Sequence, residues 1–198
     1  MLNFNFYNPT WRKFSLYPAL LLFYGGSLAS IISKRYKTLA TLLEEPKVID
    51  INFNNSERLL VSLLSPSQVM DLQIGQQLPG MERQKTPVSC YLYSFLKPFF
   101  DDYLPNEKKY DRYFDCLELL VGLIQADFNY NNMRQFYGDS GRLIWKWNMN
   151  QVELGKTKEF QEIITSLIDY GFFNNSEQRY SEIYQEHKNI IQQRNKLI

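Results

Sequence analysis

Few residues of this chain could do chemistry, and its single histidine, His187, decides most of the catalytic alternatives. A relay from a serine or cysteine nucleophile to an imidazole would have to use it. His187 falls on the apolar stripe of the helix expected at the C-terminal end, a position typical of a partly buried structural histidine. Cys90 and Cys116 lie in apolar contexts without a CxxC pattern, so we interpret them as buried, reduced thiols and expect a cytoplasmic protein.

The sequence GDSG at 138–141 is similar to the nucleophile segment of chymotrypsin-like proteases. Those enzymes are all-β barrels, the next residue here is Arg142, and the base would have to be the distant His187. A turn built from glycine, aspartate and serine explains the same residues. We therefore assign no nucleophile to this segment.

Three acidic residues, Asp111, Asp115 and Glu118, share one helix face at i, i+4 and i+7, a spacing that could hold a metal ion. Lys108 and Arg112 flank them, which favours a solvated stripe of charges instead. The chain has no glycine-rich phosphate loop, no HExxH and no nucleophile elbow. The sequence thus predicts no catalytic residue, no metal site and no cofactor.

One type of helical nuclease places an arginine and a histidine about one helical turn apart. Arg179 and His187 have seven residues between them, which separates the two groups by about two helical turns. The spacing does not fit that motif. A site scattered over Asp139, Arg142 and His187 stays open as the enzymatic alternative, with nucleic-acid processing as its chemistry.

Nucleic-acid binding needs clustered cations, ideally beside aromatic rings that stack on bases. The segment RLIWKW at 142–147 mixes both, although an expected strand turns Trp145 and Trp147 to one face and the cations to the other. A buried tryptophan pair is therefore favoured. The candidate contacts with a partner or a nucleic acid are Arg142, Lys146, Lys188 and Arg194.

Charge and composition exclude several classes of protein. With 44% apolar and 22% charged residues, the chain is neither disordered nor a disulfide-stapled miniprotein. Its net charge of +1 gives no field that would concentrate nucleic acid. The charge is uneven, because residues 1–43 carry five cations and no acid, whereas 44–198 carry 17 cations and 21 acids.

The apolar stretch 16–32 (LYPALLLFYGGSLASII) raises the alternative of a membrane anchor. Seventeen residues is the lower limit for crossing about 30 Å of hydrocarbon, and the stretch contains Pro18, Gly25 and Gly26. Cations on both sides define no orientation. We expect a buried helix and no membrane contact.

Periodicity predicts a mainly α protein, a single compact helical domain over residues 1–198 with a minor two-stranded β element. The central helix is expected over 110–128, because its apolar residues recur at helical spacing. Alternation predicts strands at 49–53 and 142–149, which would pair with each other. Thr157 is expected to cap a helix that ends at Gly171, and the last helix begins near Ser176.

Six segments, spread in order over most of the chain, share a pattern of apolar and aromatic packing positions: YPALLLFYGGSLAS (17–30), RYKTLATLL (35–43), LPGMERQKTPVS (78–89), DYLPNEKKYDRYFDCLELLVGLIQAD (102–127), GRLIWKW (141–147) and GFFNNSEQRY (171–180). Together they resemble a helical module found in the C-terminal parts of prokaryotic proteins with sirtuin-like or ATPase-type effector domains, which look like antiphage defence factors. The chain lacks the nucleotide- or NAD-binding part of those proteins, so no activity carries over. The resemblance implies a sensing, scaffolding or autoinhibitory role.

We therefore expect a non-enzymatic, cytoplasmic interaction subunit of a prokaryotic antiviral defence assembly. Its partners would be proteins, including an effector enzyme encoded nearby, and the amphipathic C-terminal helix is the expected site of homo-oligomerisation. The alternative is a protein that binds or processes nucleic acid through a scattered site.

Overall fold

The computed structural model describes residues 14–44, 47–50, 56–131, 138–144, 146 and 154–195. Within these ranges the chain is mainly helical, as the sequence predicts. The helices are α2 (Tyr17–Ile32), α3 (Tyr36–Glu44), α4 (Leu60–Leu63), α5 (Pro66–Val69), α6 (Leu72–Gly75), α7 (Pro87–Leu96), α8 (Glu107–Asn131), α10 (Lys158–Asp169) and α11 (Glu177–Asn195), with 3₁₀ turns η1 (Lys97–Phe99), η2 (Leu154–Lys156) and η3 (Phe172–Asn175).

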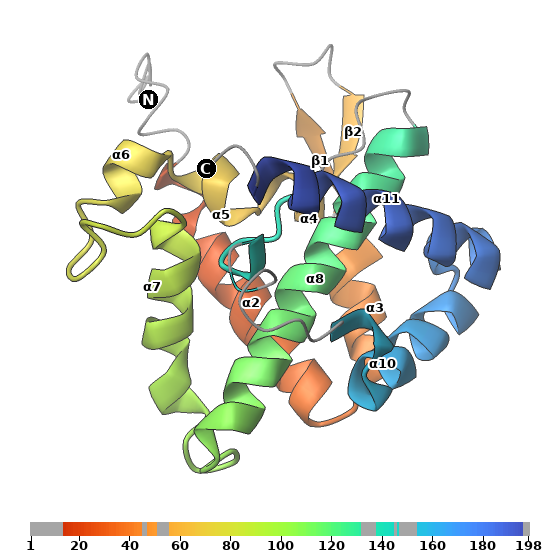
Figure 1. Cartoon of the computed structure of the whole chain (residues 1–198), viewed down its shortest axis with the longest axis horizontal. Helices are drawn as coiled ribbons and strands as arrows, with labels where there is room; N and C mark the ends of the chain where they lie inside the picture. Colours follow the sequence, from red (N-terminus) through yellow and green to blue (C-terminus); the bar gives the residue numbers. More distant parts are fainter. Residues whose placement is uncertain are drawn as a thin grey trace, which may run out of the picture.

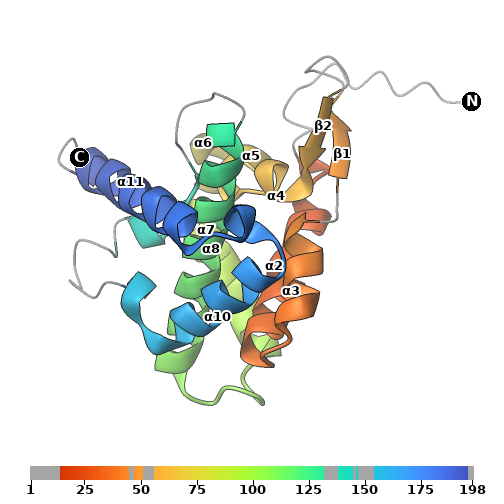
Figure 2. The ribbon, with the colours of Figure 1, turned by 90° about the vertical axis from the view of Figure 1, so that its right-hand side faces the viewer.

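Helix α8 is the axis around which the other elements pack (Figures 1 and 2). It lies between α2 on one side and α11 on the other, and it contacts both. Side chains from around most of its circumference are fully buried, among them Phe114, Leu117, Leu120 and Val121. A helix of this kind needs neighbours on every face, which confirms its predicted place at the centre.

The apolar stretch 16–32 supplies α2, whose buried residues include Leu20, Tyr24 and Leu28. Pro18 sits in its first turn, where the N–H that proline lacks would have had no acceptor inside the helix. The helix packs on α3, α7 and α8, as expected of a core helix. Over the described residues, no helix has the length and apolarity needed to span a bilayer.

The predicted pairing of strands 49–53 and 142–149 is wrong. Strand β1 (Lys47–Asp50) pairs with β2 (Ser56–Leu59), antiparallel, in a register that sets Lys47 opposite Leu59. Positions 143, 144 and 146 are helical. The physical reason is that helical spacing brings Arg142 and Lys146, at i and i+4, to one side, where both meet acids of α8. Phe53, Trp145 and Trp147 lie outside the described residues.

The C-terminal elements follow the sequence prediction closely. Thr157 caps α10 by accepting a hydrogen bond from the Phe160 N–H at 3.4 Å. The buried residues of α10 are those of the predicted stripe: Phe160, Ile163, Ile164, Leu167 and Ile168. Gly171 has a φ of 105°, in the left-handed region that glycine favours. The Ser176 hydroxyl accepts from the Arg179 N–H at 3.2 Å, where α11 begins.

Candidate functional site

The polar stripe of α8 is buried, so the predicted solvated stripe of charges is wrong. Asp115, Glu118 and Gln125 are 8%, 1% and 5% exposed. The segment 138–146 covers them, and it closes a polar layer between α7, α8 and α11 that we call the polar seam. Its members are Ser89, Asp111, Asp115, Glu118, Gln125, Asp139, Ser140, Arg142, Lys146 and His187.

Glycines let the segment 138–146 approach α8 this closely. A Cβ at Gly138 would overlap the backbone carbonyl of Gly122, so the two backbones cross in contact. Gly141 has a φ of 48°, and a Cβ there would overlap the carboxyl of Glu118. The crossing therefore requires glycine at these positions.

Asp139 organises one end of the seam. Its backbone N–H donates to Gln125 Oε1 at 2.8 Å, and Gln125 Nε2 donates to the Val61 carbonyl at 2.7 Å. The Asp139 carboxylate accepts from the N–H groups of Ser67 at 3.1 Å and Gly141 at 3.0 Å. Both carboxylate oxygens of Asp139 therefore accept hydrogen bonds from backbone N–H groups, as expected for the predicted turn.

Ser140 and His187 meet in the seam, with Ser140 Oγ 2.6 Å from His187 Nε2. Gly122 leaves the room that this pair occupies, since a Cβ there would lie 2.7 Å from Ser140 Oγ. Burial lowers the pKa of His187 to about 4, against a smaller opposing effect of Asp139, so the imidazole is neutral at pH 7. A neutral imidazole beside a serine hydroxyl is the pair that a serine hydrolase needs.

Two features separate this pair from a working nucleophile. Ser140 is 0% exposed and His187 is 2% exposed, so a substrate has no access to the hydroxyl. Within the described part of the chain, no residue forms a hydrogen bond with His187 Nδ1, whereas a catalytic imidazole is oriented by an acid at that nitrogen. The pair therefore matches the predicted buried structural histidine.

Loss of the Ser140 hydroxyl will destabilise the fold by about 1–3 kcal/mol, because it leaves His187 Nε2 buried without a partner. Urea unfolding of Ser140→Ala at pH 7 measures this. Ser181→Ala is the matched control, since Ser181 is exposed on α11 and its hydroxyl donates to the Glu177 carbonyl of the same helix. Equal unfolding free energies for both variants would contradict the assignment.

Glu118 is the most deeply buried acid of the seam. The Ser89 hydroxyl donates to Oε1, and the Leu143 N–H donates to Oε2 at 3.2 Å. Burial raises the pKa of Glu118 to about 8, against the opposing effects of Arg142 and Ser89. The carboxyl is therefore protonated at neutral pH, and it joins α7, α8 and the segment 138–146 as a neutral group.

Ion pairs close the other end of the seam. The Arg142 guanidinium bonds Asp111 and Asp115, the latter at 3.1 Å, and Lys146 Nζ bonds the same two carboxylates, that of Asp111 at 2.8 Å. The guanidinium also lies 3.6 Å from the centre of the Tyr93 ring. Two of the four candidate contact residues are thus engaged with the acids considered above as metal ligands.

The other two candidate contacts, Lys188 and Arg194, lie on α11, a different element from Arg142 and Lys146. Lys188 is half-buried, and the Arg194 side chain is outside the described residues. Across the ranges given above, the structure brings together no group of three or more histidines, cysteines or acids that could hold a metal ion.

Sequence reasoning missed Ser89 and Gln125 as members of the polar seam, and it missed Tyr93 as the ring beside the Arg142 guanidinium. One signal was available: Gly122 interrupts the middle of a long helix on its polar side, where glycine is unfavourable unless another backbone comes close. That glycine pointed to burial of the polar stripe.

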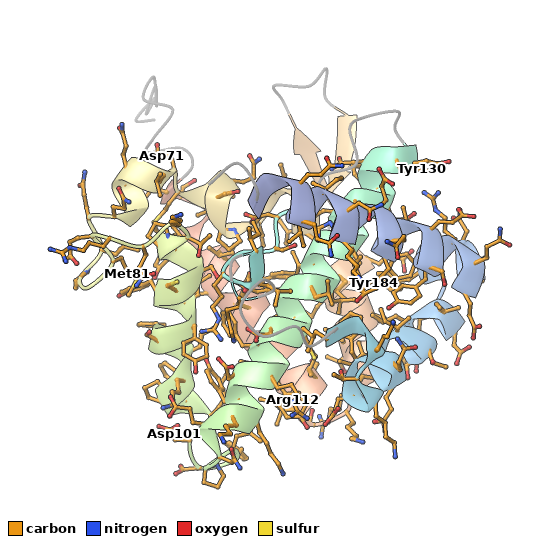
Figure 3. All side chains as sticks on the ribbon, in the orientation of Figure 1. Asp71, Met81, Asp101, Arg112, Tyr130 and Tyr184 are labelled. Atoms are coloured by element: carbon orange, nitrogen blue, oxygen red, sulfur yellow. The ribbon has the colours of Figure 1, made fainter. Side chains whose placement is uncertain are left out.

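A small cavity of about 90 Å³ opens beside Asp139, between α5, α6 and the start of α7. Its lining includes Ser67, Asp71, Thr86 and Ser89. Figure 3 shows Asp71, the residue that caps α6, away from the central helix. The volume suits a few water molecules and is well below that of usual ligand pockets.

Comparison of the chain with known protein families, with curated proteins and with solved structures found no match. The geometry of the candidate site is therefore the basis for its interpretation. Most polar groups of the polar seam hold the segment 138–146 against α8.

Proposed function

We propose that this chain is a non-enzymatic, helical protein-interaction subunit with a sensing or scaffolding role in a prokaryotic antiviral defence assembly. One observation supports the interaction role above all others: α7 and η1 carry a row of aromatic rings on the surface. We call Tyr91, Phe95 and Phe99 the aromatic face.

The rings of the aromatic face are in contact with one another. Tyr91 and Phe95 are stacked with ring centres 5.9 Å apart, and Phe95 and Phe99 are 5.8 Å apart. Phe95 is 40% exposed and Phe99 is 65% exposed. Contiguous exposed aromatic rings are uncommon on soluble proteins outside binding sites, and aromatic side chains supply much of the binding energy at protein interfaces.

The aromatic face also lacks the charges that normally solvate a surface helix. Residues 86–96 contain no charged side chain. Depletion of charge together with enrichment of aromatic rings is typical of the centre of a protein interface. The two properties coincide on one exposed side of α7, which supports docking of a partner there.

Other surfaces support the interaction role less well. The stripe of α11 considered for homo-oligomerisation packs inward, because Tyr180, Ile183 and Ile191 are buried. Arg142 and Lys146, considered for nucleic-acid binding, are engaged in ion pairs. The proposed defence role rests on the resemblance of the sequence to modules of antiphage proteins. In that role, the expected partner is an effector enzyme encoded nearby.

Affinity capture of the tagged chain from native cells, with size-exclusion chromatography and light scattering, tests the proposal. We expect wild-type protein to recover one partner at fixed stoichiometry, and Phe95→Ser/Phe99→Ser to recover at least about 10-fold less of it, a loss of one hot-spot contact or more. Tyr170→Ser is the control, since Tyr170 is an exposed ring at the end of α10.

Three results would contradict parts of the proposal. If the chain is a strict monomer and recovers no protein partner, the interaction role is contradicted. If the folded double variant recovers the partner fully, the aromatic face is not the surface that binds it. Cells that resist phage equally well with and without the chain would contradict the defence role.

A further inference from the structure

We infer that the aromatic face binds an amphipathic helix of a partner protein that carries lysine or arginine at one end. This inference rests on the proposed interaction function and adds the chemistry of the partner. It comes from the charges that border the aromatic rings.

The aromatic face ends at two exposed acids, Asp101 and Asp102. They follow Phe99 by two and three residues, and Tyr103, which is 78% exposed, comes next. Neither acid forms an ion pair within the described part of the chain. Figure 3 shows Asp101 at the far end of the molecule, where the chain turns from α7 towards α8.

The only cation in residues 91–103 is Lys97, and its Nζ lies 3.1 Å from Glu107 Oε1. Lys97 also attracts Asp101 electrostatically, but without ion-pair contact. Among the described residues, no cation lies within ion-pair distance of Asp101 or Asp102, so the end of the aromatic face carries two acids without a direct ion-pair partner. A cationic side chain of a partner would pair with these carboxylates and could also stack on an exposed ring.

The same charges disfavour the other occupants. Phosphates of a nucleic acid and headgroups of an anionic membrane would be repelled by Asp101 and Asp102. A second copy of this chain, docked through the same face by a two-fold axis, would bring two acidic ends into one interface. A basic partner is the occupant whose charge complements the face.

The shape of the face indicates a helix. Tyr91, Phe95 and Phe99 recur at i, i+4 and i+8 along α7 and η1, which makes a ridge along the helix surface. A second helix packs against such a ridge with anchors at i, i+3, i+4 and i+7. Aliphatic anchors would cover the rings, and the cationic end would reach Asp101.

Fluorescence anisotropy with two labelled peptides of about 18 residues tests the inference. Both carry leucine at the helix anchor positions; one has lysine at its remaining positions and the other has glutamate. We expect the lysine peptide to bind at least about 10-fold more tightly than the glutamate peptide, and its affinity to fall as salt is raised, as for any exposed ion pairing.

Variants separate the two parts of the face. Asp101→Asn/Asp102→Asn should weaken binding of the lysine peptide about 10-fold and flatten its salt dependence. Glu177→Gln/Glu182→Gln removes the same two charges from the exposed side of α11 and should leave binding unchanged. Phe95→Ser/Phe99→Ser should lose binding of both peptides while thermal unfolding stays within a few degrees of wild type.

Equal affinity for the two peptides, or equal weakening by the two acid pairs, would overturn the charge preference. Tighter binding of single-stranded DNA or of phosphatidylserine vesicles than of the lysine peptide would also overturn the inference. The inference would also be overturned if the protein formed a dimer that Phe99→Ser dissociates and neither peptide bound to it. If neither peptide binds but the double phenylalanine variant still loses its cellular partner, the inference fails and the proposed function stands.

Discussion

Glu118→Gln will be more stable than wild-type protein above pH 8 and will lose most of the fall in stability that the wild-type protein shows between pH 4.5 and 8. The wild-type carboxyl has a pKa of about 8 in the fold, against 4.5 for an ordinary glutamate. Folding therefore retains a proton that the unfolded chain releases. The stability contribution of Glu118 is complete below pH 4.5 and is lost as pH rises through 8.

The size of this effect follows from the distance between the two pKa values. A difference of this order corresponds to about 3–5 kcal/mol of unfolding free energy lost between pH 4.5 and 9, since each pKa unit is worth about 1.4 kcal/mol. In the Glu118→Gln variant the side-chain carbonyl oxygen can accept from the Leu143 N–H, and the NH2 group can donate to Ser89 Oγ. The amide therefore contacts both partners of Glu118 without ionising.

Urea unfolding at intervals from pH 5 to 9 measures the effect. Glu44→Gln, which removes an exposed acid from α3, should follow the wild-type curve. Glu118→Ala removes the titrating group as well, and it should also lose the fall in stability between pH 5 and 8 while being less stable at every pH because of the cavity it leaves. A fall in stability over this pH range that persists in both Glu118 variants would show that another group titrates.

Gly138→Ala will destabilise the protein by more than about 4 kcal/mol or prevent its folding, the range reached when a core substitution cannot be accommodated. The added methyl group would overlap the carbonyl of Gly122, and both partners in this clash are backbone. No side-chain rotation relieves it. Relief would require the segment 138–146 to move away from α8, which breaks the hydrogen bonds of Asp139 and Ser140.

Gly80→Ala is the matched control for the loss of glycine itself. Gly80 has a φ of 77° and would place its Cβ in open space, so alanine there costs only about 1 kcal/mol of backbone strain. Soluble yield and thermal unfolding compare the two variants. A melting temperature for Gly138→Ala close to that of Gly80→Ala would mean that the two backbones are not packed together.

The sequence predicts the helices of this chain well because their signals are local. Thr157 and Gly171 are adjacent to the helix they delimit, and the buried stripe of α10 is readable within twelve residues. The role of the polar stripe of α8 is not local. Glu118 meets Leu143, 25 residues further on, and Ser140 meets His187, 47 residues further on.

Flanking cations misled the sequence interpretation of the polar stripe for a physical reason. Lys108 and Arg112 are exposed, as expected, but they say nothing about acids one or two turns further along the helix. The alternation at 142–149 led to a wrong prediction of a strand, because two cations four residues apart fit the spacing of a strand and that of a helix equally well. Only the tertiary contacts with Asp111 and Asp115 distinguish the two.

The crossing of Gly122 and Gly138 has a consequence for how sequences of this type can diverge. A Cβ at Gly138 would meet the backbone of Gly122, so substitution at Gly138 cannot be rescued by trimming a neighbouring side chain. A Cβ at Gly122 would instead meet the side chains of Ser140 and His187. In homologous chains that keep this crossing, Gly138 should resist replacement, whereas Gly122 can change together with Ser140 and His187. Evolutionary covariation would then mark the polar seam more clearly than hydrophobicity does.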